Sequence, residues 1–314
     1  MENKQTINIF FATNDKYVKY LDVALTSIKE NASKDYNYKI IVLNGGLTQE
    51  NKTALTKHSK DNFAVEFGDV NNELTELKTH VPAEYYFTLA SFYRLFIETM
   101  YPNIDKAIYL DCDLIVKGDI SQLYNIDLKD NLLGAVNEQN CFLNPLMTQY
   151  IDVVTGIDPH KYFNSGVLLL NLKAIREFQL KNRFIDMFVR YHFESPMVDQ
   201  DYLNNLCRKR VLLLPNCWNY ESVPACPLEG ELKIRHYAFA LKPWKTKQVE
   251  YADLFWDYAK KSQFYEIILQ EFNSITPEIL QREMMGAGQL IAIAQKLINS
   301  EHTFKKVIID KEDK

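Results

Sequence analysis

KAIYLDCDLIVKGD, residues 106–119, is the stretch around which the rest of the sequence is organised. Apolar residues flank Asp111 and Asp113, a pattern that predicts a buried strand ending in a charged pair. In extended backbone, residues i and i+2 point to the same face about 7 Å apart, so both carboxylates can approach one cation. Two buried like charges are costly unless a cation or hydrogen-bond donors neutralise them. The pair is therefore a candidate metal site, although a single Asp-x-Asp is by itself more typical of a solvated turn.

Strands and helices alternate along the first part of the chain. Apolar runs predict strands at residues 7–12, 39–43 and 64–67, and apolar residues at helical spacing follow from Tyr17 and from about Thr48. This alternation predicts an α/β fold in which helices cover both faces of a mostly parallel sheet. Ligands of such sheets bind beyond the carboxyl ends of the strands, so the loop 13–16 and the two aspartates should lie at the same rim.

The later segments extend this plan. Residues 69–86 are polar and acidic and predict a long loop, which leads into a helix over 88–100. That helix carries Arg94 among apolar neighbours, where an arginine is either a snorkelling surface residue or one placed to meet an anion. Residues 139–160 have weak periodicity and predict irregular structure over the active face. The other predicted elements are short helices at 120–124 and from Asp199, strands at 132–136, 211–214 and 234–238, a polar turn that feeds a buried strand over 162–172, and a long amphipathic helix to about Tyr191.

Composition limits the class of protein. The 314 residues are 47% hydrophobic and 25% charged, which suits one large core or one core with a smaller appendage. A net charge of -5 without a long basic run argues against a nucleic-acid partner. The five cysteines are odd in number and form no C-x-x-C pair, so a disulfide framework or a zinc site is not expected. A cytoplasmic location fits best, because the N-terminal residues lack the features of a signal peptide and the apolar runs are short.

Six motifs occur in order between Ile7 and about Trp244. They are FATNDKY (11–17), SFYRL (91–95), YLDCD (109–113), YFNSGV (162–167), DQD (199–201), and HY followed by KPW (236–244). Through these motifs the chain resembles the family 8 glycosyltransferases, retaining enzymes of the GT-A fold. The family includes bacterial lipopolysaccharide galactosyl- and glucosyltransferases and, more distantly, the glycogenins. The resemblance implies a GT-A fold with a mostly parallel, Rossmann-like sheet.

The resemblance also implies a role for each motif. Asp111, Asp113 and His236 would bind Mn²⁺ or Mg²⁺, and a carboxylate-rich site with one imidazole suits these ions better than zinc. The metal would hold the diphosphate of a UDP-sugar. Asp199 and Gln200 would hydrogen-bond the hexose, with Glu138 near the sugar, and these three form the implied catalytic set. The implied nucleotide-sugar-binding residues are Ala12, Thr13, Asn14 and Tyr17 for uracil and ribose, Arg94 and Lys242 for the diphosphate, Cys112 between the two aspartates, and Asn164, Ser165 and Gly166 close to the sugar and ribose.

The residue types also bear on the reaction. A metal with Arg94 and Lys242 would stabilise the negative charge that develops on the UDP leaving group. The family position opposite the anomeric carbon is Gln200, and an amide is a poor nucleophile, so front-face attack is favoured over a covalent intermediate. The chain departs from the family pattern at Asn14 and Glu138, where aspartates are common, and at Phe239, which replaces a glycine. The last change puts the loop from His236 to Lys242 in question, because glycine permits close backbone approach to a ligand.

Beyond Trp244 the resemblance thins. We expect a catalytic domain over residues 1–245 and a small α-helical C-terminal extension over 246–314. Amphipathic patterns at 251–272 and 277–298 predict helices. The extension is expected to cover the catalytic domain, with peripheral contact to the inner face of a membrane or to a partner as the alternative. The tail 310–314 is expected to be disordered.

The identity of the substrates is open at this level. Galactose is favoured over glucose as the donor hexose, and the acceptor is expected to be an oligosaccharide or glycoprotein, as on a surface polysaccharide or lipopolysaccharide. Two alternatives remain: a non-catalytic glycan-binding or scaffold protein of the same fold, and a nucleotidyltransferase that makes UDP-sugars. The second normally has a glycine-rich loop after the first strand, and there is no glycine between Met1 and Asn44. An intact set of Asp111, Asp113, His236 and Lys242 weighs against the scaffold.

Overall fold

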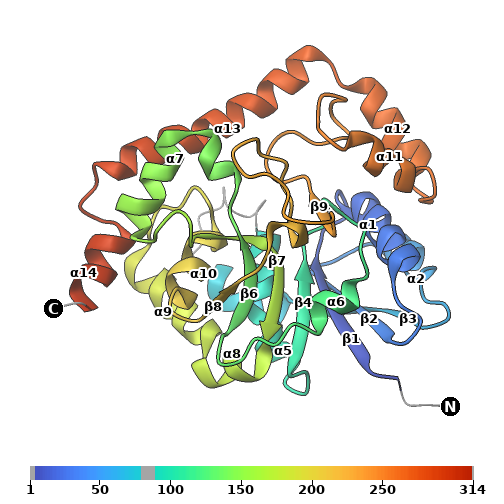
Figure 1. Cartoon of the computed structure of the whole chain (residues 1–314), viewed down its shortest axis with the longest axis horizontal. Coiled ribbons are helices and arrows are strands. Elements are labelled where there is room, and N and C mark those ends of the chain that lie inside the picture. The colour runs from blue at the N-terminus through green and yellow to red at the C-terminus, as the bar shows by residue number, and fades with distance from the viewer. Residues whose placement is uncertain (1–3, 79–88, 313–314) are drawn as a thin grey trace.

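A computed structural model of the protein describes residues 4–78 and 89–312. At its centre lies a seven-stranded sheet (Figure 1). The β1–β2, β2–β3, β1–β4 and β6–β8 pairs are parallel, whereas β7 runs antiparallel to β4 and β6. The predicted α/β fold with a mostly parallel sheet is therefore confirmed. In spatial order the strands are β3 (Phe63–Asp69), β2 (Asn37–Asn44), β1 (Thr6–Ala12), β4 (Lys106–Leu110), β7 (Phe163–Asn171), β6 (Leu133–Asn137) and β8 (Val211–Leu213).

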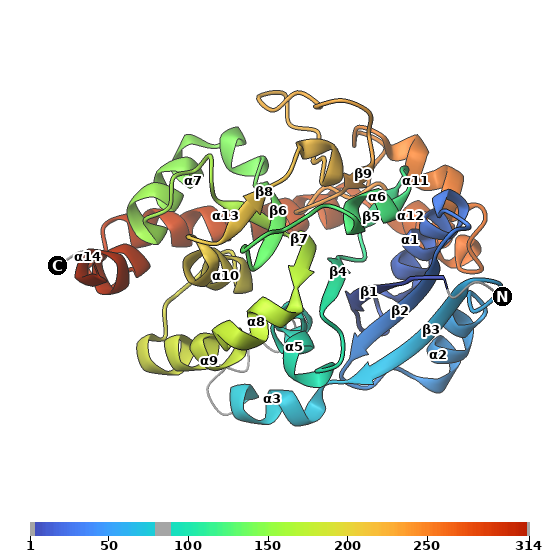
Figure 2. The ribbon, with the colours of Figure 1, turned by 60° about the horizontal axis from the view of Figure 1, so that its bottom comes forward.

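Helices cover both faces of this sheet. Their bounds are α1 (Val18–Asn31), α2 (Gln49–Thr56), α3 (Asn71–Lys78), α4 (Leu89–Phe92), α5 (Ile97–Met100), α6 (Ile120–Tyr124), α7 (Pro145–Tyr150), α8 (Leu172–Phe178), α9 (Leu180–Tyr191), α10 (Asp199–Cys207), α11 (Ala252–Ala259), α12 (Tyr265–Ser274), α13 (Pro277–Ile298) and α14 (Asp310–Glu312). Figure 2 shows α1 and α2 on one side of the strands and α5, α8 and α9 on the other.

The two faces follow from the alternation of side chains along each buried strand. In β1, Ile9 and Phe11 pack with Leu21 and Leu25 of α1, whereas Phe10 belongs to the cluster on the opposite face. In β4, Ile108 and Leu110 likewise join the α1 side, and Tyr109 joins the other. Because both faces are covered, these strands read as continuous apolar runs rather than as alternating ones.

A small second sheet places the histidine motif. The chain bends after β4 and continues as β5 (Leu114–Val116), which pairs antiparallel with β9 (Ile234–His236). In this register Leu114 lies opposite His236, and the Tyr237 amide donates to the Asp113 carbonyl at 2.9 Å. The pairing brings His236 next to the two aspartates, across more than 120 residues of sequence.

The C-terminal helices are attached to the rest of the chain at both ends. Phe255, Tyr258 and Ile268 of α11 and α12 pack with Tyr20 and Trp244. The last turns of α13 pack on the α7 region, and Phe304 is fully buried in the main core. Between these attachments α13 spans the top of the molecule, from α12 to α7 (Figure 1). The boundary at residue 245 stays a prediction, and within the described part of the chain no helix is long and apolar enough to cross a bilayer.

Two predictions of irregular structure were wrong. Residues 139–160 contain a 3₁₀ turn (Asn140–Leu143), α7 and a π-helical turn (Ile151–Thr155). Pro145 begins α7 rather than breaking a helix, because a proline at the first helical position lacks only an amide that would be unpaired there. The predicted long loop 69–86 holds α3 over its first part, and its residues 79–86 lie outside the described chain.

Other boundaries also differed. The helix expected over 88–100 is divided, from Leu89 on, into α4, a 3₁₀ turn (Tyr93–Phe96) and α5. The long helix expected to end near Tyr191 is divided into α8 and α9 at Gln179, whose φ is +56°. The polar turn in residues 162–166 is largely part of β7, because neighbouring side chains satisfy its polar groups. The expected disorder was wrong for residues 310–312, which are helical, while 313–314 lie outside the described residues.

Candidate active site

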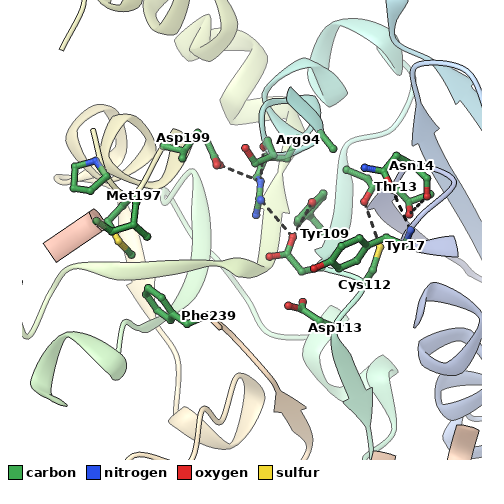
Figure 3. Close-up of a pocket in the computed structure, with 17 residues that line it drawn as sticks. Thr13, Asn14, Tyr17, Arg94, Tyr109, Cys112, Asp113, Met197, Asp199 and Phe239 are labelled. Atoms are coloured by element: carbon green, nitrogen blue, oxygen red, sulfur yellow. Dashed lines mark hydrogen bonds and ion pairs between the residues drawn. The ribbon is translucent and has the colours of Figure 1, made fainter. Parts of the chain in front are cut away.

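A pocket of about 400 Å³ opens at the carboxyl ends of β1 and β4. Figure 3 shows Thr13, Asn14 and Tyr17 at one end, Met197 and Phe239 at the other, and Arg94 and Asp113 between them. The rim that was predicted from the strand ends therefore holds many of the predicted site residues. Those that line the pocket are Ala12, Thr13, Asn14, Tyr17, Arg94, Asp111, Cys112, Asp113 and Asp199.

The other predicted residues lie behind this lining. Asn164, Ser165, Gln200, His236 and Lys242 are buried and contact the lining residues or one another. Glu138 is fully buried and lines a neighbouring cavity.

The two aspartates of the Asp-x-Asp pattern and His236 form a cluster of three side chains that can bind a metal ion. One ligand atom each from Asp111, Asp113 and His236 can be chosen so that all lie within 4.8 Å of one another. His236 Nε2 lies 3.2 Å from Asp113 Oδ1 and 4.0 Å from Asp111 Oδ2. The two aspartates sit in a bend between β4 and β5 rather than in the extended strand that was predicted, and the Asp111 amide donates to the Gly166 carbonyl at 2.8 Å.

Gly166 leaves the space that this cluster needs. A Cβ built on Gly166 would lie 2.3 Å from His236 Cε1 and 2.8 Å from Asp111 Oδ2. Any larger residue would push the imidazole or the carboxylate out of the cluster. The glycine of the YFNSGV motif is therefore required by the site and not by its backbone conformation, since it lies within β7.

Positive charge surrounds Asp113. Burial raises the pKa of this carboxyl, but the Lys242 ammonium and His236 lower it more, so its pKa lies well below the ordinary value. Lys242 also donates to the Tyr237 carbonyl, which fixes the ammonium at the edge of the pocket. Asp113 is therefore ionised at neutral pH and available to a cation.

Arg94 is a buried side chain that lines the pocket, and it is not a snorkelling surface residue. Its guanidinium donates to the Ser165 and Ser91 carbonyls and lies over the Tyr109 ring, 4.4 Å from the ring centroid. Its nitrogens lie 3.3 Å from Asp111 Oδ1 and 3.1 Å from Asp199 Oδ2. Burial lowers the pKa of Arg94, but these two carboxylates raise it by more, so the pKa lies above its ordinary value.

Asp199 stands out by its perturbed pKa. Burial raises the pKa of the carboxyl to about 6, although Arg94 acts in the opposite direction. Its buried Oδ2 accepts no aligned hydrogen bond within the described chain, because the Arg94 Nε–H is directed at the Ser91 carbonyl. This oxygen can accept a hydrogen bond from a ligand.

Gln200 is held at both ends of its amide. Its Oε1 accepts from the Ser165 amide at 2.9 Å, and its Nε2 donates to Glu138 Oε2 at 3.1 Å. Glu138 Oε2 also accepts from Asn164 Nδ2 at 2.8 Å. Two of the three catalytic residues implied by the resemblance, Gln200 and Glu138, thus form one hydrogen-bonded unit beside Ser165.

Sequence reasoning missed Glu221, the buried partner of Glu138. Glu221 Oε1 accepts from the same Asn164 amide at 2.8 Å, and its Oε2 accepts from the backbone of Gln139. Burial, and then the charge and hydrogen bond of Glu138, raise the pKa of Glu221 well above its ordinary value. One proton is therefore shared between two buried carboxyl groups. No pattern in the sequence marked this residue.

Sequence reasoning gave no role to Asn219, which lies beside His236. Its Oδ1 lies 2.8 Å from His236 Nδ1, and its Nδ2 donates to Asn164 Oδ1 at 2.9 Å. Asn164 Oδ1 must be an acceptor because it also takes the Gly166 amide at 2.8 Å. Asn219 therefore turns its oxygen to His236, so Nδ1 carries a proton and Nε2 is the ring nitrogen that faces the aspartates.

The two departures in the loops have structural counterparts. Asn14 Oδ1 accepts from the amides of Lys16 and Tyr17 at 3.1 and 3.3 Å, so it holds the turn between β1 and α1. Phe239 has φ of +62°, in the left-handed region that favours glycine, and its ring is 40% exposed at the end of the pocket. The loop thus keeps a glycine-like backbone while it carries a large apolar side chain.

Comparison with known proteins agrees with this geometry. The family model described as glycosyl transferase family 8 matches residues 8–248. A Haemophilus influenzae protein with the provisional name glycosyltransferase is 30% identical over 252 residues, which cover 77% of this chain and 74% of that protein. The lipopolysaccharide 1,2-glucosyltransferase of Escherichia coli is 24% identical over 291 residues, 86% of this chain and 79% of the relative. Among solved structures, the galactosyltransferase LgtC in complex with donor and acceptor sugar analogues matches with a TM-score of 0.68 and 24% identity, over 88% of this chain and 100% of that chain, which shows a shared fold.

Proposed function

The chain belongs to glycosyltransferase family 8 and has the GT-A fold, and we propose that it transfers a hexose from a UDP-sugar to a glycan acceptor with retention at the anomeric carbon. Family membership carries the coarser part, a glycosyltransferase that uses a nucleotide-sugar donor and a divalent metal ion. The observation that best supports the finer part is the cluster of Asp111, Asp113 and His236 at the pocket, with Arg94 and Lys242 beside it.

The balance of charges in the pocket favours the binding of a divalent cation. By formal charge, Asp111, Asp113 and Asp199 contribute three negative charges, against two positive charges from Arg94 and Lys242. With one net negative charge, these side chains would repel a diphosphate, whereas a bound divalent cation reverses the sign. The clearance at Gly166 and the position of His236 Nε2, 3.2 Å from Asp113 Oδ1, fit such an ion. Two carboxylates and one imidazole are a donor set suited to Mn²⁺, which would supply a Lewis acid at the diphosphate.

The remaining residues have roles that follow from their positions. The turn from Ala12 to Tyr17 lines one end of the pocket and would hold uracil and ribose. Lys242 would turn from Asp113 toward the diphosphate, and the Arg94 guanidinium would add a second positive charge beside the diphosphate. The negative charge on the leaving group would then be stabilised where it develops. The Oδ2 of Asp199, which accepts no aligned hydrogen bond within the described chain, would accept one from a hydroxyl of the hexose. The Asn164, Ser165 and Gly166 segment would approach the sugar through its backbone.

The reaction we favour is front-face substitution. The acceptor oxygen bonds to the anomeric carbon as the sugar–phosphate bond breaks, the bonding electron pair leaves with UDP, and the acceptor proton passes to the departing phosphate oxygen. Gln200 suits a positioning role in this scheme better than that of a nucleophile, because both ends of its amide are engaged by Ser165 and Glu138. Glu138 is itself buried and holds two side-chain amides, Asn164 and Gln200.

Galactose is the donor hexose that we favour, with glucose as the alternative. LgtC is a galactosyltransferase and the Escherichia coli relative is a glucosyltransferase, so similarity supports a UDP-hexose without choosing between them. We further propose an oligosaccharide or glycoprotein as the acceptor and action in the cytoplasm, at the inner face of the membrane. A non-catalytic scaffold is not favoured, because it would have no use for an assembled set of cation ligands.

The experiment that tests the proposal measures UDP release from a panel of UDP-sugars, with Mn²⁺ or with EDTA. We expect slow hydrolysis of one UDP-hexose that requires the metal and is lost in Asp113→Asn. The matched control is Asp186→Asn on α9, an exposed aspartate in an ion pair with Arg190 that lies away from the pocket. If no UDP-sugar shows metal-dependent turnover or binding, or if both variants lose activity equally, the proposal is wrong.

A further inference from the structure

A second cavity, of about 250 Å³, adjoins the donor pocket. Met197, Phe239 and Leu290 line both spaces. Glu138, which holds Gln200 on the donor side, also lines the second cavity. A molecule bound here can therefore present a group to the donor pocket without leaving the cavity.

The walls of this cavity are mainly apolar. They come from the α7 region, the loop after β9 and the middle of α13, and include Leu143, Met147, Phe239, Leu241, Met284 and Ile291. The polar residues in the lining are Glu138, Asn140 and Asn144. The Asn144 side chain is occupied in capping α7, where its oxygen accepts from the Leu146 amide at 3.0 Å. Polar partners for a ligand are therefore concentrated at the end nearest Gln200.

The exposure of these side chains sets the cavity apart from the rest of the surface. Among the described residues, ten large hydrophobic side chains are exposed, and four of them, Leu143, Phe239, Leu241 and Met284, line this cavity. Such a concentration of exposed apolar surface is typical of a binding site. A purely oligosaccharide ligand would bury hydroxyl groups against walls that return no hydrogen bonds, which is unfavourable.

We propose that the cavity binds the apolar aglycone of the acceptor, so that the preferred acceptor is a sugar linked to an aliphatic or aromatic group. This inference rests on the proposed function, because it names the acceptor class of the same site. The sugar lies toward Glu138 and the donor pocket, and the aglycone lies between Leu241, Met284 and Leu143. An apolar cavity of about 150 Å³ is large enough for benzene, so this one holds a phenyl ring or a chain of about eight carbons.

The test compares octyl with methyl β-glycosides of glucose, galactose and N-acetylglucosamine, below the critical micelle concentration. Calorimetric titration in the presence of Mn²⁺ and UDP measures binding, and UDP release from the active UDP-sugar measures transfer. We expect octyl glycosides to bind at least tenfold more tightly than their methyl counterparts. The preference should fall severalfold in Leu241→Ser.

Leu213→Ser on β8 is the matched control, because Leu213 is 42% exposed and Leu241 is 41% exposed, and Leu213 does not line the cavity. Equal affinity for octyl and methyl glycosides, or an equal loss in the two variants, would overturn the inference. Absence of an octyl preference in the wild type, with metal-dependent UDP-sugar hydrolysis intact, refutes this inference alone. Octyl binding that depends on Leu241 without any UDP-sugar turnover supports the ligand class of the cavity and counts against the proposed function.

Discussion

Replacing Glu221 by glutamine should flatten the pH dependence of stability between about pH 5 and 7. Glu221 is buried beside Glu138, and burial together with that neighbour raises its pKa well above the ordinary value of 4.5. The folded protein therefore keeps a proton on this pair that the unfolded chain releases as the pH rises above about 4.5.

The magnitude follows from proton linkage. The stabilisation from a carboxyl with a raised pKa is complete below the unfolded pKa and is lost as the pH rises toward the folded pKa. Where the folded state holds one extra proton, the free energy of unfolding falls by about 1.4 kcal/mol per pH unit. From about pH 5 to 7 the wild type should therefore lose up to about 3 kcal/mol more than Glu221→Gln.

Glutamine is the right probe because it mimics the protonated acid. Its amide oxygen can still accept from the Gln139 and Asn140 backbone, and its nitrogen can donate to Glu138 as the shared proton does. Asn164 loses one of its two acceptors, which adds a cost of about 1–3 kcal/mol at every pH. The slope is therefore the diagnostic quantity, and the absolute stability is not.

Urea denaturation at several pH values, followed by far-ultraviolet circular dichroism, measures both slopes. Glu50→Gln, an exposed glutamate in the first turn of α2, controls for the loss of a surface carboxyl. Parallel curves for wild type and Glu221→Gln would refute the shared-proton pair. A steeper fall in Glu221→Gln than in wild type would show that the sign of the argument is wrong.

Three further predictions concern other parts of the chain. Asp199→Asn should abolish an acidic limb near pH 6 in kcat/KM for the UDP-sugar, because the carboxyl with a pKa of about 6 must be ionised to accept from the hexose; an unchanged pH–rate profile would contradict this. Asn219→Leu should weaken Mn²⁺ binding about 10- to 100-fold in calorimetric titration, because His236 loses the partner of Nδ1; unaltered affinity would exclude that role. Gly286→Ala and Gly288→Ala should each raise the free energy of unfolding by about 1 kcal/mol in urea denaturation, because no described atom lies within 4 Å of the added Cβ; destabilisation would point to an unseen contact or hinge.

The sheet and its rim could be predicted from the sequence because their signals are local. The apolar runs of β1, β2 and β4 and the helical spacing in α1 reflect burial on both faces of the sheet, and the observed bounds agree with the predicted ones to within a few residues. The errors came where a local signal has two meanings. A proline breaks a helix in its interior but begins one at the first position, as Pro145 does, and the packing of α7 against α13 decides between these outcomes.

The site was predictable to the extent that its residues carry motifs. Asp111 and Asp113 could be found from their spacing, whereas His236 was found through the family resemblance, since only the β5–β9 register brings it to them. Glu221 has no such signal. A lone glutamate in an irregular segment is normally exposed, and its burial is acceptable only because Glu138 shares its proton and three donors converge on it.

In the buried polar network beneath the pocket, the donor and the acceptor of each hydrogen bond are fixed. The backbone amides of Gly166 and Ser165 can only donate, so the oxygens of Asn164 and Gln200 must face them. The nitrogens of these two side chains must then face Glu138, which accepts both. Asn164 in turn requires a donor from Asn219, and this leaves the Asn219 oxygen for His236 Nδ1. The same backbone amides of β7 therefore fix the amide of Gln200 at the sugar end and the proton on His236 Nδ1 at the metal end, and hydrogen bonds through Gln200, Asn164 and Asn219 join both ends to Glu138.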